Sequence, residues 1–255
     1  MAYIISVVNQ KGGVGKTTTT VNLAAFLGEK KKKTLVIDLD PQGNATSAFG
    51  IDKTHLETSV YDVLVNETSL KDAIVKKVKT NLDVCPTNIN LAGAEVELVS
   101  AMSRETILQR AIAEVSEEYS YILIDCPPSL GLLTLNALTA STGILVPIQG
   151  EYYALEGLTQ LMDTVNLVKR RLNPELTVFG VVITMFDSRT QLARQVTEEV
   201  REYFQEKVFR TVIPRNIRLA EAPSYGKTIA EFDGRSKGGR AYKDLAIEVI
   251  KRTDI

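Results

Sequence analysis

The chain has 255 residues, 44% of them hydrophobic and 24% charged, and a formal net charge of −1. A chain of this size and composition buries a sizeable core, so we expect one domain spanning residues 1–255 rather than disorder or two domains. The near-neutral charge excludes a protein coated with positive charge for permanent nucleic-acid binding, so any DNA contact has to be a local patch.

We expect neither a membrane-spanning segment nor a secretory signal peptide in this sequence. No apolar run approaches the length of a membrane span, and the first residues lack the basic segment and cleavage site of a signal peptide. We therefore expect a cytoplasmic protein without a membrane partner. Cys85 and Cys126 lie far apart and form no metal-binding spacing, which predicts two small buried side chains.

Short apolar runs, most of them continuous, alternate with longer helical patterns along the chain. The runs predict strands at 3–8, 34–38, 82–85, 121–125, 143–148, 178–184 and 207–213. Continuous runs are typical of strands that are buried on both faces. Helices are predicted between them at 17–28, 104–118, 155–172 and 191–204. This order predicts a doubly wound α/β fold, in which a mostly parallel twisted sheet has helices on both faces.

The segment KGGVGKTT, residues 11–18, follows the first predicted strand and opens the first predicted helix. It fits the phosphate-binding pattern GxxxxGK[ST] except at its first position, which is Gln10, so we interpret it as a deviant P-loop. In such a loop backbone amides and the helix start cradle phosphates, Lys16 reaches the terminal phosphates and Thr17 ligates Mg²⁺. The predicted nucleotide-binding residues of the loop are Gly12, Gly13, Val14, Gly15, Lys16, Thr17 and Thr18. Lys11 is a second lysine that this loop does not require.

Three aspartates stand at the ends of two predicted strands. Asp38 and Asp40 follow one apolar run, and Asp125 ends another in the form expected of a Walker B strand. Because the carboxyl ends of parallel strands share one crevice, we expect these acids beside the P-loop. Asp125 is predicted to hold Mg²⁺ through water, Asp38 to support the metal shell, and Asp40 to position the attacking water.

Six segments of the chain resemble the ParA family of partitioning ATPases, most closely its chromosomal Soj branch. They are KGGVGKTTT, DLDPQGNAT, LAGAEVELV, IDCPPSLGLLTLNAL, EYYALEGL and TVIPRNIRLAEAPSYGK. The resemblance implies ATP and Mg²⁺ as ligands, and slow hydrolysis that a partner stimulates. It also implies an ATP-sandwich homodimer in which Lys11 contacts the nucleotide of the other subunit, as an arginine finger does.

The resemblance extends to the base and to DNA. No [NT]KxD segment for guanine is visible, and by resemblance the residues near the adenine are Met185, Pro214, Arg215 and Asn216. The family implies weak, sequence-neutral binding of double-stranded DNA by the dimer, which would associate with the nucleoid through Arg189 and Arg218. From the residues alone, we would interpret both arginines as ordinary surface or ion-paired side chains.

By resemblance the partner is a ParB/Spo0J-like centromere-binding protein, the replication initiator is a further candidate partner, and the role is chromosome or plasmid segregation with replication control. A MinD-like membrane-switch ATPase would need a basic amphipathic tail, whereas residues 241–255 predict a closing helix of mixed charge. An electron-transfer ATPase similar to the nitrogenase iron protein would need two cysteines placed to share a cluster. Cys85 and Cys126 fit that requirement poorly. A regulator that uses ATP only as a switch and scarcely hydrolyses it is not separated by the sequence from a partitioning ATPase with slow turnover.

Overall fold

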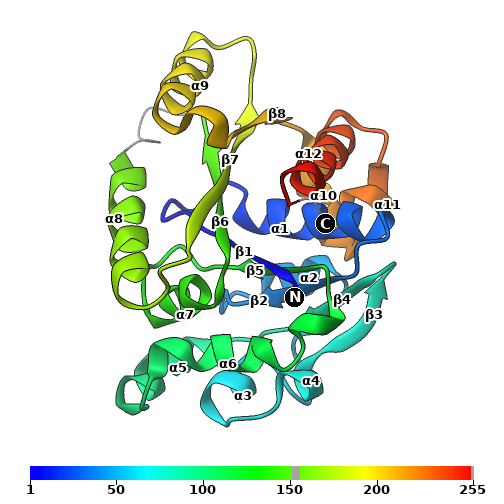
Figure 1. The fold of residues 1–255 in the computed structure, drawn as a ribbon. Helices are drawn as coiled ribbons and strands as arrows, with labels where there is room; N and C mark the ends of the chain where they lie inside the picture. The colour runs from blue at the N-terminus through cyan, green and yellow to red at the C-terminus, as the bar shows by residue number, and fades with distance from the viewer. Residues whose placement is uncertain (151–155, 254–255) are drawn as a thin grey trace.

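The computed structural model describes residues 1–150 and 156–253, and within these ranges the core is an eight-stranded sheet (Figure 1). Its strand order is β3-β4-β2-β5-β1-β6-β7-β8. The strands are β1 Tyr3–Val7, β2 Thr34–Asp38, β3 Val75–Lys79, β4 Leu82–Cys85, β5 Tyr121–Asp125, β6 Gly143–Gln149, β7 Thr177–Phe186 and β8 Val208–Pro214. All neighbouring pairs are parallel except β3 with β4. The predicted doubly wound, mostly parallel sheet is confirmed.

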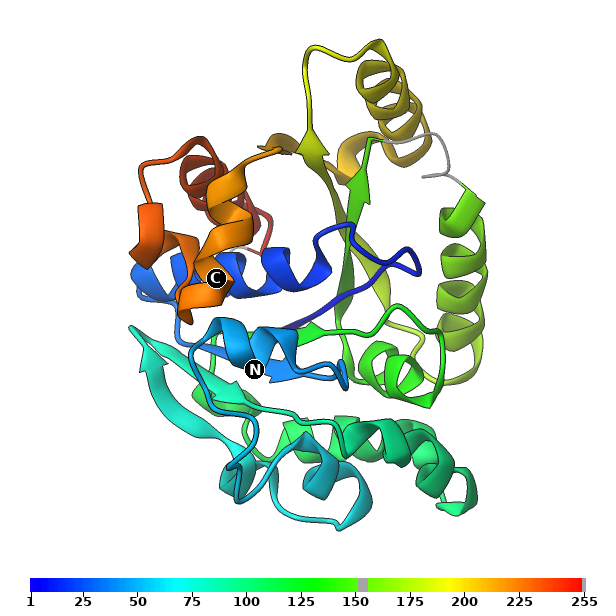
Figure 2. The same ribbon diagram turned by 180° about the vertical axis from the view of Figure 1, so that it is seen from behind.

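Helices cover both faces of the sheet (Figures 1 and 2). One face carries α1 Lys16–Glu29, α2 Asn44–Ala48, α10 Ile217–Glu221, α11 Ile229–Asp233 and α12 Lys237–Thr253. The other carries α3 Val60–Val65, α4 Leu70–Ala73, α5 Leu91–Glu97, α6 Ile107–Ala113, α7 Leu132–Ala140, α8 Glu156–Arg171 and α9 Gln191–Phe204. Since strand side chains alternate between faces, Ile5 and Val7 of β1 contact the first layer and Val8 the second.

Three expectations about elements need correction or lie outside the described residues. Strand β3 escaped prediction because its sequence, VKKVK, is an exposed edge strand with three lysines and little apolar signal. The predicted helix at 104–118 is broken, and only 107–113 is α-helical. The predicted start of the helix at Leu155, and most of the segment EYYALEGL, lie outside the described residues.

A buried asparagine causes the break in that helix. An uninterrupted α-helix would pair the Leu108 amide with the Arg104 carbonyl. Instead Asn136 of α7 lies between them: its Nδ2 donates to the Arg104 carbonyl at 2.8 Å, and its Oδ1 accepts from the Leu108 amide at 3.1 Å. The short 3-10 helix η2, Arg104–Thr106, is therefore separate from α6 and fixed to α7.

Strand register brings the predicted acidic residues to one edge of the sheet. Asp38 is paired with Asp125, and Asp125 with Val7, so the ends of β2, β5 and β1 are level. The P-loop leaves β1 at this edge and leads into α1 (Figure 2). The carboxyl edge of the sheet is therefore where a site forms.

Candidate nucleotide-binding site

The loop between β1 and α1 is open, and the first amides of α1 have no partner within the helix. Gly13 and Gly15 have φ of 76° and 89°, a left-handed conformation that favours glycine, and methyl groups added at Gly12 or Gly13 would meet nothing within 4 Å. No side chain among the described residues caps the N-terminus of α1. Unpaired amides and the positive end of the helix dipole form a cradle for an anion.

Lys16 lies inside this cradle rather than in solvent. The side chain is buried, and its Nζ donates to the carbonyl oxygen of Lys11 at 3.2 Å. Burial lowers the pKa of Lys16, while the charges of Asp125 and Asp40 oppose that shift. The loop thus folds back on its own lysine, and an arriving phosphate would provide a stronger partner than the carbonyl.

The cradle is held by residues that the sequence analysis missed. Asn9 donates through Nδ2 to the Pro147 carbonyl at 2.7 Å and accepts the Lys11 amide at 3.0 Å. On the other side, the Thr184 hydroxyl donates to the Val14 carbonyl at 2.8 Å. These bonds fix the loop to β6 and β7, and no local motif could have revealed them because the partners are distant in sequence.

Asp125 and Thr17 meet as predicted. The Thr17 hydroxyl donates to Asp125 Oδ2 at 2.7 Å, and the Thr20 hydroxyl donates to Oδ1 at 3.0 Å. Asp125 is fully buried, and that burial, reinforced by the charge of Asp38, raises its pKa. A hydroxyl and a carboxylate at the mouth of a phosphate cradle are the oxygen ligands that suit Mg²⁺, which keeps several waters.

Asp38 is engaged with its own chain. Its Oδ2 accepts from the Thr46 amide at 2.8 Å and the Thr46 hydroxyl at 2.7 Å, and its Oδ1 accepts from the Asp40 amide at 3.2 Å. Complete burial raises its pKa despite these bonds. Its two oxygens therefore hold the loop 40–46 and the start of α2, in addition to any role near a metal. The described residues contain no group of three acidic, histidine or cysteine side chains that could hold a metal alone.

Asp40 lies on the loop that Asp38 secures. Its side chain is largely buried, and its Oδ1 accepts the Gln42 amide at 3.0 Å. The turn closes where the Gly43 amide donates to the Asp40 carbonyl at 2.8 Å, with Gly43 at φ 62°. The Lys53 ammonium donates to the Gln42 carbonyl at 2.6 Å. These contacts restrain the turn, so its position relative to the P-loop is defined.

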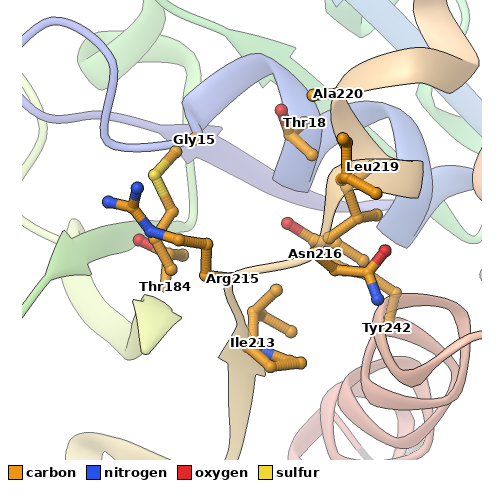
Figure 3. A pocket seen from close by; sticks show the side chains of 12 residues that line it. Gly15, Thr18, Thr184, Ile213, Arg215, Asn216, Leu219, Ala220 and Tyr242 are labelled. Carbon is orange, nitrogen blue, oxygen red and sulfur yellow. The ribbon is translucent and has the colours of Figure 1, made fainter. Parts of the chain in front are cut away.

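A pocket of about 400 Å³ adjoins the P-loop (Figure 3). It brings together all four residues predicted near the base with two from the P-loop and α1, namely Met185, Pro214, Arg215, Asn216, Gly15 and Thr18. The sequence analysis missed Tyr242 of α12, which lines the pocket while its hydroxyl lies 3.1 Å from that of Thr19. The pocket is continuous with the phosphate cradle through Gly15 and Thr18, so the two together have the arrangement that a nucleotide requires.

The two predicted DNA-binding arginines stay outside this pocket and are ion-paired. The Arg189 side chain is 86% exposed and donates to both oxygens of Asp187, at 2.9 and 2.6 Å, and these bonds hold the pKa of Asp187 below its usual range. Arg218, 52% exposed, lies 3.0 Å from Glu221 and 3.7 Å from Asp233. Both follow strands that end at the P-loop edge, but their charge is partly balanced within the chain.

Comparisons with known proteins agree with this geometry. The family model described as AAA domain matches residues 2–178. The sporulation initiation inhibitor protein Soj of Bacillus subtilis is 57% identical over 249 residues, which cover 98% of each chain. The chain belongs to the Soj/ParA family. Another member, the chromosome-partitioning ATPase Soj of Treponema pallidum, is 47% identical over 99% of this chain and 98% of its own.

Solved structures place this Soj/ParA-family chain in the same fold. A Mycobacterium smegmatis protein named cobyrinic acid a,c-diamide synthase, with bound ADP and magnesium, has a TM-score of 0.88 and 37% identity, covering 100% of this chain and 96% of its own. The cell division ATPase MinD of Pyrococcus furiosus has a TM-score of 0.81 and 28% identity, covering 98% and 99%. In the described part of this chain, no helix is both long and apolar enough to cross a membrane.

Proposed function

We propose that this Soj/ParA-family chain is an ATPase for chromosome or plasmid partitioning, which dimerises around ATP and binds DNA in that state. The observation that carries the proposal is the open amide cradle with Lys16, Thr17 and Asp125 at its mouth, next to the 400 Å³ pocket. The relatives named as partitioning ATPases support the same reaction. ATP and Mg²⁺ are its ligands, and the pair supplies a reactive γ-phosphoryl group whose charge the metal partly neutralises.

Different residues would bind the phosphates, the metal and the base of ATP. Amides of the cradle would donate hydrogen bonds to the phosphate oxygens, and Lys16 would exchange its bond to the Lys11 carbonyl for one to a phosphate oxygen. Thr17 and Asp125, which are hydrogen-bonded to each other in this structure, are the residues that would hold the metal and its waters. The base would occupy the pocket that Met185 and Asn216 help to line.

Two residues contribute to hydrolysis rather than to binding. Asp40, on its restrained turn, orients the attacking water by accepting a hydrogen bond from it. Lys11 reaches the nucleotide of the partner subunit and places positive charge where the leaving phosphates gain negative charge. Because Lys11 acts only across the interface, hydrolysis depends on dimerisation, and slow unstimulated turnover follows.

Dimerisation also controls DNA binding. Arg189 and Arg218 are ion-paired in the single chain, so phosphates have to compete with Asp187, Glu221 and Asp233 for them. Two such exchanges give a single chain too little binding free energy to hold DNA, whereas a dimer makes twice as many phosphate contacts. About four phosphate contacts correspond to a slope of log K against log salt on the order of −3 to −4. Contacts to phosphates carry no sequence information, so the dimer binds any duplex and associates with the nucleoid.

A ParB/Spo0J-like protein is the partner that stimulates hydrolysis, and the replication initiator is a further partner of the same cycle. The MinD-like alternative finds less support in the C-terminal helix. The apolar face of α12 is buried against α1 and β8 through Tyr242, Leu245 and Val249, so it is not available to a membrane surface. The partitioning role therefore accounts for more of the described residues.

DNA binding in three nucleotide states tests the proposal. Fluorescence anisotropy of labelled duplexes is measured with ATP, with ADP and without nucleotide, across a salt series. Binding is expected with ATP alone and with equal affinity for unrelated sequences. Arg189→Glu and Arg218→Glu should each abolish it while ATP-dependent dimerisation persists, and Arg171→Glu, at the far end of α8, is the matched control. Equal binding in all three states would refute the switch.

A further inference from the structure

We infer that an apolar ridge and the acidic groove beside it form a docking surface for a basic protein segment, and that docking there acts on the hydrolytic site. The ridge consists of Val96 at the end of α5, Val99 in the 3-10 helix η1, Leu98–Ser100, and Met102, which follows η1. The inference rests on the proposed function, because it assigns to this surface the ParB-like partner that stimulates hydrolysis.

The ridge is unusually apolar for an exposed segment. Val96 is 76% exposed, Val99 59% and Met102 91%. Isolated apolar side chains are common on protein surfaces, whereas several within one short segment indicate an interaction site. Methionine adapts to irregular partners because it is unbranched and polarizable, which suits a surface that accepts a flexible segment.

A groove of about 570 Å³ runs from Met102 between α3, η1 and α6. Its apolar floor includes Leu64, Leu98 and Ile107, and its charged lining consists of three carboxylates against one guanidinium, namely Glu67, Glu97, Glu114 and Arg110. This excess of negative charge complements a segment that carries lysine or arginine beside its apolar side chains. The occupant we assign is therefore a basic amphipathic segment of another protein.

The same segment of the chain touches the loop that follows Asp125. Glu95, next to Val96 on α5, has a buried Oε1 without a hydrogen-bond partner among the described residues. A methyl group on Gly131, at the end of the loop 126–131, would lie 1.9 Å from that atom. The Glu95 carboxylate therefore lies against the backbone of Gly131, and this contact connects α5 to the loop.

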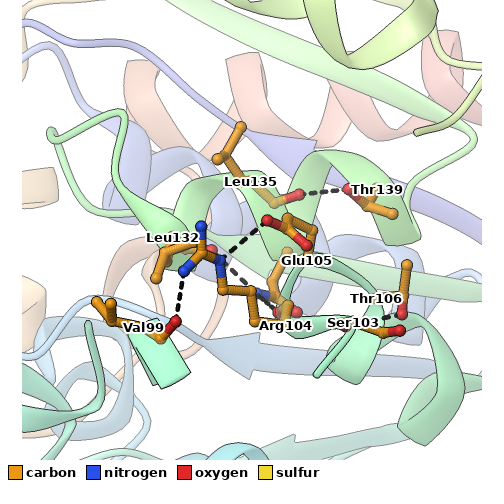
Figure 4. Close-up of polar contacts among 9 residues, drawn as sticks. Val99, Ser103, Arg104, Glu105, Thr106, Leu132, Leu135 and Thr139 are labelled. Carbon is orange, nitrogen blue, oxygen red and sulfur yellow. Dashed lines mark hydrogen bonds and ion pairs between the residues drawn. The ribbon is translucent and has the colours of Figure 1, made fainter. Parts of the chain in front are cut away.

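A second connection leaves the other end of the ridge (Figure 4). Arg104 donates through Nη1 to the Val99 carbonyl and pairs with Glu105 at 3.1 Å, while its own carbonyl is held by Asn136 of α7 at 2.8 Å. Helix α7 begins directly after the loop 126–131. Both connections thus reach the α7 end of the loop 126–131, whose other end is Asp125, and docking on the ridge can change the position of Asp125 beside Thr17 through this loop.

Stimulated hydrolysis measured on the full chain tests this inference. The probe is the purified, full-length ParB-like protein from the same organism, titrated against phosphate release with saturating ATP and duplex DNA. Met102→Lys should raise the concentration for half-maximal stimulation about tenfold, because it removes an apolar anchor and repels a basic segment. Met102→Glu should raise it less. Tyr203→Lys, which changes an exposed aromatic on α9, is the matched control and should behave as the parent.

A second variant separates docking from coupling. Glu95→Ala leaves the ridge and the groove lining in place, so the half-maximal concentration should stay near that of the parent while maximal stimulation falls. Unstimulated hydrolysis and the ATP-dependent dimer should be unchanged in Met102→Lys.

Each contrary outcome is distinct. If Met102→Lys and Met102→Glu are stimulated as the parent is, the docking surface is wrong. If Met102→Glu is the more damaging change, the occupant is not basic, and if either variant loses the ATP-dependent dimer, the ridge is an interface between copies of this chain. A parent chain that the ParB-like protein does not stimulate at all would instead overturn the proposed function.

Discussion

Asp38→Ala should destabilise the nucleotide-free protein because that carboxylate holds the loop leading to Asp40. The change leaves the buried amides of Thr46 and Asp40 without acceptors, while the Thr46 hydroxyl still accepts from the Thr87 amide at 3.0 Å. An unpaired buried donor costs about 1–3 kcal/mol, and relief of the buried charge offsets part of two such losses. We expect the free energy of unfolding to fall by about 2–4 kcal/mol, or roughly 5–15 °C in Tm.

The pH dependence gives this prediction its sharpest test. Burial raises the pKa of Asp38 to about 6, so the folded parent binds a proton more readily than the unfolded chain. The stability of the parent therefore falls as the pH rises from the pKa of the unfolded chain to that of the folded protein. The alanine variant lacks this loss, so the gap between the two proteins should narrow from about pH 5 to about pH 8. Urea unfolding at both pH values measures it, with exposed Asp163→Ala as a control expected within about 0.5 kcal/mol. A gap that widens with pH, or never exceeds that of the control, would refute the reasoning.

Three further changes probe the site. Asp40→Ala should keep ATP binding while phosphate release falls by about 10²-fold or more, and normal release would remove Asp40 from the water-positioning role. Thr184→Val loses the bond to the Val14 carbonyl and should weaken ATP binding about fivefold by calorimetry, since one hydrogen bond contributes about 1 kcal/mol; unchanged affinity would show that the P-loop needs no support from β7. Asp125→Asn should raise the Tm of the nucleotide-free protein, increasingly so as pH rises, because burial raises the pKa of the parent carboxyl; a lower Tm at every pH contradicts this.

The sequence predicted the parts of this molecule whose signal is local. Seven of the eight strands were predicted from apolar runs, most of them continuous and buried on both faces, although the edge strand β8 includes the exposed Arg210. The P-loop and Walker B patterns lie within single βα units. The base pocket was approached only through resemblance, and the structure does bring Met185, Pro214, Arg215 and Asn216 to one cavity beside the P-loop. Their role in binding the base stays a prediction.

The features that the sequence could not show depend on partners distant in the chain. Asn136 breaks a helix that periodicity predicts as continuous, because its side chain replaces a backbone hydrogen bond from another element. Tyr242 reaches the pocket from the C-terminal helix, and Asn9 fixes the P-loop to β6. Asp38 stands at a strand end, as a metal-binding carboxylate would, but its oxygens accept hydrogen bonds from the loop that follows. Only the structure distinguishes these two roles.

The central claim, an ATP-dependent dimer completed by Lys11, is tested most directly by light scattering on parent and variant chains in ATP, in ADP and without nucleotide. The Asp40→Ala chain, which should hold ATP, is expected to double from the monomer mass of 28.1 kDa with ATP alone. Adding Lys11→Ala should keep ATP bound while the mass stays at that of the monomer, and Lys31→Ala, an exposed lysine at the end of α1, is the matched control. A full ATP-dependent dimer without Lys11 would contradict the account.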